Sequence, residues 1–591
     1  MNERHVYEDY IQTYRVNRNN PLKILLSFFK GYEKRMFLTF IFLILKQSPV
    51  WVIPIAVSNI INIASNADSK NYYEILIYAG IALVFIIQNV FTSYAQVKLF
   101  GKVVRDIELN LRSTLTIKLQ KLSMTFHKTM QSGKIMSKIM RDVENVQTLL
   151  YMSVGALLNI LLDTSIAVVV ILMSSPVVLL FFMAVIPVAV FTIYKFRKPI
   201  QTNNQEFRRG MEETQAAIAE MVEMIPVTRA HGLEEKEIKK MQRRLKNISH
   251  TGYRLDQINT LFGATGWVVF QVFQILCLAF TGSMAYLGKI SIGEVVLYQT
   301  YFAQIISQIA TLINLYPVLT KGIESIKSIG EIIDTDEIEA NNAIIPLNTL
   351  KGKVTFSNVV FKYADGSDYI LEDFNLEIAA GTSVAFVGES GSGKSTLLNL
   401  LVGFYEPTEG RILIDGVNMS NLDKKEFRSQ IAIVPQNTLL FSGSIRDNIT
   451  YSTGNVSDEQ VLDVLKDVGL LEMVSNLPEG IHTKLGEHGG SLSGGQRQRI
   501  SIARALIRKP KLIVFDEATS ALDSASEKLV QKATEHLMQQ CTTIMVAHRL
   551  STIKGADMIC VMEGGKIIEK GSYEELMNKK SHFYKLKKLQ D

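Results

Sequence analysis

The sequence predicts a two-part fold, an α-helical membrane domain with six transmembrane helices fused to a soluble α/β domain. Long apolar runs are confined to the part of the 591-residue chain before about Pro317. From Gly352 onward the pattern changes to short apolar strands, for example residues 354–356 and 374–378. A chain of this length also exceeds what a single hydrophobic core organises. We therefore expect a membrane domain followed by a globular domain.

Six apolar stretches are long enough to cross a bilayer, whose hydrocarbon core of ~30 Å requires ~20 helical residues. They are residues 36–58, 73–95, 150–173, 177–196, 262–287 and 295–317. The first follows a polar leader and is longer than the apolar part of a signal peptide, so we expect it to stay in the membrane. Within the leader, residues 22–32 predict a short amphipathic helix at the interface.

Lys and Arg set the expected orientation. Ten of them lie between Lys98 and Arg141, and residues 197–254 and the leader are also rich in them. The short connections between spans carry almost none. Because basic loops stay in the cytoplasm, we expect both termini and the globular domain to be cytoplasmic. The small formal net charge of +6 does not suggest nucleic acid as a partner.

The two long basic segments between spans show a helical pattern of apolar residues. A segment of ~50 residues folded as a descending and an ascending helix would reach ~35 Å below the bilayer. We expect its tip near residues 126–131, and the tip of the second segment near residues 232–236. Such tips can contact the globular domain. The alternative is a pair of solvated helical hairpins without a partner.

A phosphate-binding loop stands out in the second half. The buried strand 383–387 is followed by Gly-Glu-Ser-Gly-Ser-Gly-Lys-Ser and then by a helical pattern from Thr396, the context that this motif requires. Backbone N–H groups and the helix N-terminus can bind phosphates, Lys394 can reach the β- and γ-phosphates, and the Ser395 hydroxyl can coordinate Mg²⁺. The predicted nucleotide-binding residues here are Gly388, Glu389, Ser390, Gly391, Ser392, Gly393, Lys394, Ser395 and Thr396.

A second acidic motif ends the predicted strand 512–515. Asp516 is placed to hold the Mg²⁺ that bridges the phosphates, and Glu517 to polarise the attacking water. Phosphoryl transfer needs mainly positioning and charge neutralisation, so this small set suffices for ATP hydrolysis.

The run Leu492-Ser493-Gly494-Gly495-Gln496 resembles the signature motif of ATP-binding-cassette (ABC) proteins. From about residue 20 to residue 591 the chain is similar to an exporter-type half-transporter of that family. The resemblance implies a leader with an interfacial helix (1–35), a six-span membrane domain with cytoplasmic extensions (36–322), a linker (323–350) and a nucleotide-binding domain (351–591). It also implies an ATPase coupled to transmembrane transport, with ATP and Mg²⁺ as cofactors.

Further site residues are implied by this resemblance. Tyr363 looks like the aromatic residue that stacks on adenine, and Gln436 like the glutamine that contacts Mg²⁺ and couples to the membrane domain. His548 resembles the histidine that touches the γ-phosphate, and Asp523 lies in a loop that crosses the dimer interface. Residues 483–490 correspond to a loop that touches the partner's cytoplasmic helices.

The resemblance further implies a dimer. The signature residues Ser493, Gly494, Gly495 and Gln496 would face the phosphates held by the loop of the other subunit, so a chain with one such domain needs a partner. The glutamate, the histidine and the signature are all intact in this sequence. We therefore favour a homodimer over a heterodimer.

Polar residues inside the spans are the clues to a substrate. The candidates for a substrate cavity are Lys46, Asp163, Gln271, Gln274, Gln304 and Gln308. Isolated charges are costly in lipid, so such residues face a cavity or each other. Lys46 and Asp163 fall at similar depth, and we hypothesise an ion pair or a shared polar cavity between them. The alternative is that these residues only hold helices together.

Three functions fit these features. The first is export of amphipathic small molecules, lipids or peptides from the cytoplasm by alternating access. The others are import on the same fold, as in some siderophore systems, and an ATP-gated channel or sensor that transports nothing. In each case we expect a multi-pass protein of the plasma membrane, and the Lys-, Asn- and Ile-rich composition suggests a bacterium.

Overall fold

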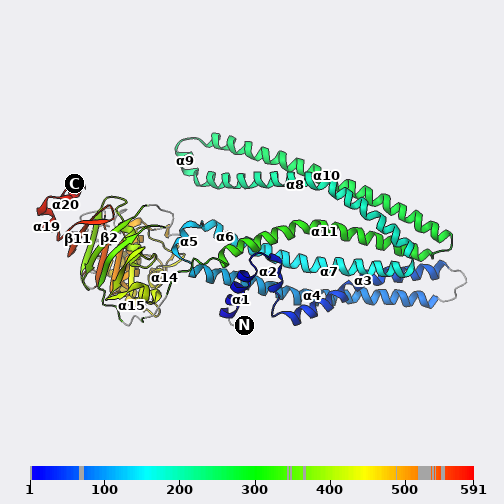
Figure 1. The fold of residues 1–591 in the computed structure, drawn as a ribbon, viewed down its shortest axis with the longest axis horizontal. Helices are drawn as coiled ribbons and strands as arrows, with labels where there is room; N and C mark the ends of the chain where they lie inside the picture. The colour runs from blue at the N-terminus through cyan, green and yellow to red at the C-terminus, as the bar shows by residue number, and fades with distance from the viewer. Residues whose placement is uncertain are drawn as a thin grey trace. The chain divides into compact units, whose positions relative to one another are not determined.

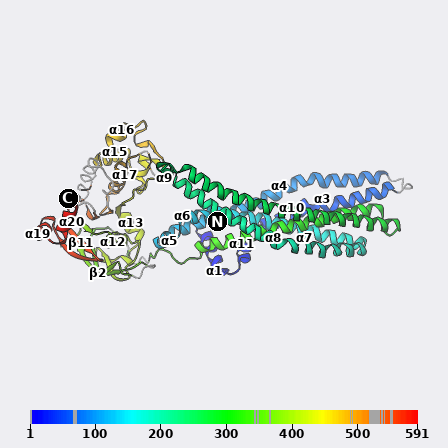
Figure 2. The ribbon, with the colours of Figure 1, turned by 90° about the horizontal axis from the view of Figure 1, so that it is seen from above.

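The computed structural model describes residues 3–65, 72–341, 345, 349–363, 368–486, 489, 490, 492–516, 534, 538, 541–547 and 553–590. The chain forms two compact units (Figures 1 and 2). Unit 1 comprises Met1–Gln120 and Ser132–Thr335, and unit 2 comprises Lys121–Gln131 and Asp336–Asp591.

The described residues of unit 1 form helices and short connections between them. Its long helices are α3 (Glu33–Ser65), α4 (Tyr72–Lys121), α7 (Val143–Ser174), α8 (Pro176–Glu223), α10 (Glu234–Tyr286) and α11 (Ile292–Ile333). Its short elements are α1 (Glu3–Val16), α2 (Pro21–Ser27), α6 (Ser132–Ser137), a π-helical turn (Lys138–Asp142) and α9 (Ile225–Ala230). Helix α11 packs against α7, α3 and α10, and α8 packs along α10 (Figure 1).

The long helices contain the six predicted spans. In the part of the chain that the structure describes, five helical segments are long and apolar enough to cross a membrane: α3, α4, Ser132–Ser174, α10 and α11. Helix α8 contains the predicted fourth span, and its crossing stays a prediction. Many large apolar side chains on these helices are exposed, such as Phe91 and Trp267. Exposed apolar side chains suit a helix surrounded by lipid, where backbone groups are satisfied within the helix.

A proline in α3 explains one interhelical contact. Pro49 has no N–H, so the carbonyl of Leu45, four residues earlier, lacks its usual helical donor. The Gln88 side chain of α4 donates to that carbonyl at 2.7 Å, and Asn89 donates to the carbonyl of Lys46 at 2.6 Å. Neighbouring helices commonly satisfy backbone groups freed in this way. Polar residues of the second span therefore fasten α4 to α3.

The leader is more structured than the sequence predicted. The interfacial helix expected over residues 22–32 is α2, which ends at Ser27 and begins with Asn20 as N-cap and Pro21 at N1. The preceding helix α1 was not predicted. It is held by buried tyrosines, since Tyr10 stacks on Phe28 of the leader with ring centroids 5.4 Å apart. Tyr7, Tyr10 and Tyr14 recur at helical spacing, a signal that could have revealed α1.

Unit 2 is built on two main sheets, and β7 and β8 form a separate two-stranded pair. The larger has the order β12-β11-β3-β10-β9-β6, and the smaller has the order β2-β1-β4-β5. Strands β6, β9, β10, β3 and β11 are parallel, whereas β12 is antiparallel to β11. The strands are β1 (Val354–Phe361), β2 (Leu371–Ile378), β3 (Ser383–Gly388), β4 (Glu409–Ile414), β5 (Val417–Asn418), β6 (Ile431–Val434), β7 (Gly443–Ser444), β8 (Lys484–Leu485), β9 (Leu512–Asp516), β10 (Thr542–Val546), β11 (Met558–Glu563) and β12 (Lys566–Gly571).

Both faces of the larger sheet are buried, one mainly by helices and the other by the smaller sheet with α12. The unit also contains the following helices. They are α5 (Met124–Thr129), α12 (Lys394–Leu401), α13 (Lys424–Gln430), α14 (Ile445–Thr450), α15 (Asp458–Asp467), α16 (Leu471–Ser475), α17 (Gly494–Leu506), α19 (Tyr573–Lys579) and α20 (His582–Gln590). Along β3, Ala385 and Val387 join one core, and Val384 and Phe386 join the other. A strand buried on both faces reads as a continuous apolar run, as predicted for residues 383–387.

The first predicted tip groups with unit 2, although the resemblance assigned its residues to the membrane domain (36–322). Ser123 N–H donates to the carbonyl of Glu337 at 2.8 Å, and Glu339 N–H donates to the carbonyl of Lys121 at 2.9 Å. Residues around α5 therefore pair with the chain that follows α11. The second tip, which includes α9, belongs to unit 1. Its expected contact with a nucleotide-binding domain stays a prediction.

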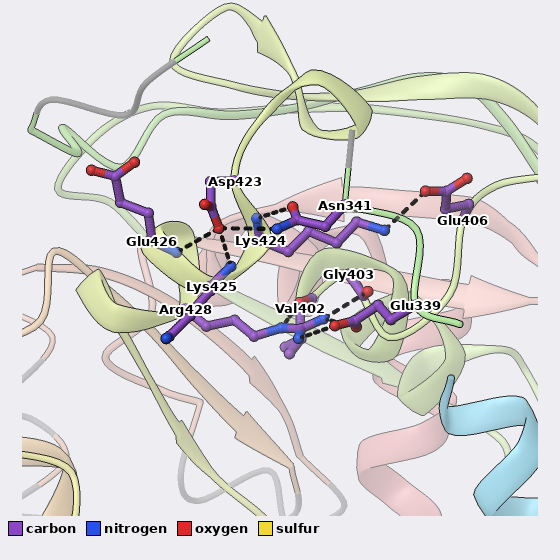
Figure 3. Close-up of polar contacts among 10 residues, drawn as sticks. All are labelled: Glu339, Asn341, Val402, Gly403, Glu406, Asp423, Lys424, Lys425, Glu426 and Arg428. Carbon is purple, nitrogen blue, oxygen red and sulfur yellow. Dashed lines mark hydrogen bonds and ion pairs between the residues drawn. The ribbon is translucent and has the colours of Figure 1, made fainter. Parts of the chain in front are cut away.

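Ion pairs and hydrogen bonds attach the segment after α11 to helix α13 (Figure 3). Arg428 of α13 binds both carboxylate oxygens of Glu339 at 2.6 and 3.0 Å. The same guanidinium donates to the carbonyls of Val402 and Gly403, at the end of α12. Two parallel bonds to one carboxylate fix direction as well as distance. Arg428 thus joins the segment that enters unit 2 to the helix that begins in the phosphate-binding loop.

Candidate functional site

The phosphate-binding loop joins β3 to α12, as the sequence predicted. Gly391 and Gly393 have φ values of 85° and 96°, which a side chain disfavours. A Cβ at Gly388 would collide with the carbonyl of Met562, and one at Gly393 would lie 3.0 Å from the carbonyl of Ile370. Glycine is therefore required at these positions of the loop. The backbone path that results lets N–H groups turn inward.

Lys394 lies within the loop that precedes it. Its Nζ donates to the carbonyls of Gly388 and Glu389 at 2.9 and 2.7 Å, and to the Ser392 hydroxyl at 3.2 Å. The side chain is 5% exposed, although it carries a charge. These oxygen partners supply the hydrogen bonds that a buried ammonium requires. Negative phosphate groups fit at this position.

The oxygen atoms of Ser395 and Asp516 come together beside this loop. The Ser395 hydroxyl donates to Asp516 Oδ1 at 3.4 Å, although 121 residues separate the two. The contact arises because Ser395 opens α12 and Asp516 ends β9, one strand removed from β3 in the parallel sheet. A hydroxyl and a carboxylate are hard oxygen ligands of the kind that Mg²⁺ takes. This donor set fits the predicted metal site.

Tyr363 follows β1 and approaches the same loop. Its hydroxyl lies 3.1 Å from the Thr396 hydroxyl, in the first turn of α12. The ring packs perpendicular to Phe361 and to Tyr405, with centroids 5.0 and 5.3 Å apart. The aromatic side chain is therefore held at the edge of the predicted phosphate site, which is where a base could stack.

The signature residues form a capped helix N-terminus. Ser493 is the N-cap of α17, with its hydroxyl accepting from Gln496 N–H at 3.2 Å and the Gln496 side chain accepting from Ser493 N–H at 2.8 Å. The helix begins at Gly494, inside the signature motif. The Gly494 and Gly495 N–H groups lie before the first intrahelical bond, at positions suited to an anion.

Three predicted site residues, Glu517, Asp523 and His548, lie outside the described residues. Gln436 follows β6 and is exposed. Its predicted contact with Mg²⁺ stays a prediction, as do the roles assigned to the other three.

A second polar centre lies in the membrane domain, around Asp163 of α7. This carboxylate is fully buried and accepts hydrogen bonds from Gln47 at 2.7 Å, Trp51 at 2.8 Å and Gln308 at 2.7 Å. The donors come from α3 and α11, so one carboxylate joins three helices. Neutral N–H donors satisfy its oxygens, as a buried charge requires.

The hypothesised ion pair between Lys46 and Asp163 is wrong. Lys46 instead donates to the Gln96 side chain of α4 at 3.4 Å. The reason is geometric, because residues 46 and 47 are about 100° apart around a helix. When Gln47 faces α7, Lys46 points toward α4. Trp51 was missed, although it lies four residues after Gln47 on the same helical face and its indole is an obligate donor.

The predicted glutamines do not form one cluster. Only Gln308 reaches Asp163. Gln274 supplies its backbone carbonyl to the side chain of Gln299 at 3.3 Å. Gln304 and Gln271 are half-buried on α11 and α10. Their proposed role in substrate binding stays a prediction.

Comparisons with known proteins agree with both halves of this arrangement. A family model described as ABC transporter transmembrane region matches residues 36–309, and one described as ABC transporter matches residues 371–520. A Bacillus subtilis protein is 32% identical over 582 residues, which cover 96% of this chain and 99% of that protein. A Staphylococcus aureus protein is 33% identical over 580 residues, which cover 96% and 100%.

Both relatives carry provisional names as multidrug export ATP-binding/permease proteins. Among solved structures, a bacterial Atm1-family ABC exporter with ATP bound superimposes with a TM-score of 0.80 at 26% identity. That match covers 94% of this chain and 98% of the other.

Proposed function

Because this chain belongs to the ABC transporter family and joins a transmembrane region to an ATP-binding domain, we propose that two copies of it form an exporter of amphipathic compounds. Each chain is an ATP-driven export ATPase and a multi-pass protein of the plasma membrane. The homodimer, the substrate class, the Mg²⁺ site and the cytoplasmic placement of the termini are the proposal. One observation carries the ATPase site, the convergence of Lys394, Ser395 and Asp516 on one loop.

Each residue has a distinct role in the proposed reaction. Lys394 and the loop N–H groups bind the β- and γ-phosphates, and Ser395 and Asp516 hold Mg²⁺. Mg²⁺ held by these two residues would supply positive charge that neutralises the charge developing on the transferred phosphoryl group. Glu517 accepts a proton from the attacking water, and His548 contacts the γ-phosphate.

Two features support a dimer. The N-terminus of α17 presents the N–H groups of Gly494 and Gly495 as a second anion-binding end, which we assign to ATP held by the partner copy. The second cytoplasmic tip exposes apolar side chains that a partner would cover: Met224 is 44%, Ile225 41% and Val227 46% exposed. Exposed large apolar side chains close together in the sequence suit an interface.

The substrate proposal rests on the relatives' names and on the polar centre around Asp163. Amphipathic compounds need an apolar path with a few polar groups, and Asp163, Gln47 and Gln308 are such groups on helices of the membrane domain. Cassette closure on ATP would turn this path outward, and hydrolysis would reset it.

The replacement Glu517→Gln tests the hydrolysis site. We expect ATP binding to persist while ATP turnover falls about 10²- to 10⁴-fold, the usual contribution of a general base. Nucleotide binding and phosphate release are measured on the full chain in lipid nanodiscs. Unchanged turnover would refute Glu517 as the base.

Direction and cargo are tested together in sealed vesicles. The purified chain is reconstituted in both orientations, and ATP is supplied on one side so that only molecules with outward-facing cassettes are active. A panel of amphipathic compounds should stimulate ATP hydrolysis and move away from the ATP-containing side. Movement toward that side would indicate an importer, and hydrolysis-independent flux would indicate a channel.

A further inference from the structure

Lys128, in the first cytoplasmic tip, lies over two aromatic rings of unit 2. Its Nζ is 5.1 Å from the ring centroid of Tyr363 and 5.1 Å from that of Tyr405. The two rings are perpendicular, at 89°, so one ammonium contacts both. A cation within ~6 Å of a ring centroid is attracted by the electron-rich face of the ring.

This arrangement lies at a cavity of about 480 Å³ lined by Lys128, Tyr363, Tyr405, Glu339, Glu406 and Lys424. The two acids of this cavity form ion pairs with cations other than Lys128. Glu406 pairs with Lys424 at 2.9 Å, and Glu339 pairs with Arg428 at 2.6 Å. The ammonium of Lys128 is therefore directed to the aromatic rings.

Tyr363 is held from several sides. Its hydroxyl contacts Thr396, at the start of α12, and Phe361 and Tyr405 pack perpendicular to its ring. The ammonium of Lys128 adds a contact to the ring face. Since each contact restricts rotation of the ring, a base that stacks on Tyr363 does not have to order that side chain first. Affinity gained by removing such an ordering cost is preorganisation.

We infer that Lys128 is a positioning residue for base binding, which holds the Tyr363 ring so that a nucleotide base can stack on its other face. The inference rests on the proposed role of Tyr363. The inference also links base binding to the membrane domain, because α5 is continuous in sequence with α4 on one side and α6 on the other. If Lys128 favours base binding, bound base must equally favour the position of α5 that places Lys128 on the ring.

The test compares a ligand that has a base with one that does not. ATP and inorganic tripolyphosphate both offer phosphates to Lys394, but only ATP offers a base to Tyr363. Affinities are measured on the full chain in lipid nanodiscs, with EDTA present to prevent turnover. In Lys128→Met we expect ATP affinity to fall about 3- to 10-fold, the range of a partly desolvated cation–π contact, while tripolyphosphate affinity is unchanged.

Two further variants complete the design. Lys128→Arg keeps a cation over the rings and should retain most of the ATP affinity. Lys588 lies 5.8 Å from the Tyr584 ring in α20 and is the matched control, since Lys588→Met removes the same kind of contact at another place. That control should bind both ligands normally. Tripolyphosphate binding also reports whether each variant is folded.

The outcomes separate this inference from the function on which it rests. If Tyr363→Ala leaves the preference for ATP over tripolyphosphate intact, the proposed base site is wrong. If Tyr363→Ala reduces that preference and Lys128→Met does not, only the inference about Lys128 is wrong. Tighter ATP binding in Lys128→Met would also overturn it, because the ammonium would then compete with the base for the same face.

Discussion

Lys394 in the nucleotide-binding domain and Asp163 in the membrane domain are both buried charges surrounded by neutral partners. Lys394 is 5% exposed and donates to groups two to six residues away in its own loop. Asp163 is 0% exposed and accepts from side chains 112 to 145 residues away on two other helices. Both satisfy the rule that a buried charge needs hydrogen bonds, but by opposite routes.

The difference has a functional consequence. A charge held by its own loop stays in place when the surrounding domain moves, which suits a residue that must meet the same phosphates in each cycle. A charge held by three helices ties their relative positions together. Losing Lys394 should therefore remove chemistry with little effect on the fold, whereas losing Asp163 should loosen the helical bundle.

The largest expected effect comes from Lys394→Met. Removing the cation from the phosphate site should reduce ATP turnover about 10²- to 10³-fold, as for loss of one electrostatic contact to a transition state. Thermal unfolding should change little. Phosphate release and unfolding in detergent are measured side by side, with the exposed Lys425→Met on α13 as control. A large loss of stability in Lys394→Met would show that Lys394, like Asp163, is needed for the fold, and would contradict the proposed difference between them.

Asp163→Leu should act mainly on stability. Three interhelical hydrogen bonds are lost, and at ~0.6 kcal/mol for each such bond in a membrane protein the cost is about 2 kcal/mol. Thermal unfolding of the full chain in detergent measures it. The control is Thr300→Val, because the Thr300 hydroxyl bonds a carbonyl of its own helix. Equal stability of the two variants would show that Asp163 does not hold the helices.

Asp163→Asn should have a smaller effect on stability. The amide keeps the size and one acceptor oxygen, but its NH₂ group faces donors, so we expect a cost of about 1 kcal/mol. If the centre also senses substrate, stimulation of ATP hydrolysis by transported compounds should change in this variant. Unchanged stimulation and transport would limit Asp163 to helix packing.

The smallest effect is expected for Trp51→Phe. The ring volume is largely kept while the indole N–H, which donates to Asp163 at 2.8 Å, is removed. Loss of this single bond should cost about 0.6 kcal/mol. A loss of stability equal to that of Asp163→Leu would mean that the Trp51 hydrogen bond alone accounts for the stability that Asp163 contributes.

Features of local origin were predictable. The phosphate-binding loop was recognisable because glycine, lysine and serine occur at fixed spacing between a buried strand and a helix. The cap of α17 also has a local origin, because Ser493 and Gln496 are three residues apart, although this cap was not predicted. The apolar spans followed from length and composition alone.

Features that depend on helix rotation were not predictable. Lys46 and Gln47 are adjacent in sequence, and only packing decides which of them faces α7. The role of Lys128 was equally hidden, because its partners Tyr363 and Tyr405 lie more than 200 residues away on other elements. Helix α1 was overlooked because its polar composition masked the buried tyrosines.

By itself, the sequence determined the long apolar helices, the nucleotide-binding loop and the family. These depend on residue type at short spacing, which chain geometry converts directly into local structure. Only the tertiary structure decided that Asp163 joins three helices through Gln47, Trp51 and Gln308, and that Lys128 lies on Tyr363. Such contacts depend on which face each helix turns to its neighbours, and that orientation is a property of the whole packed domain.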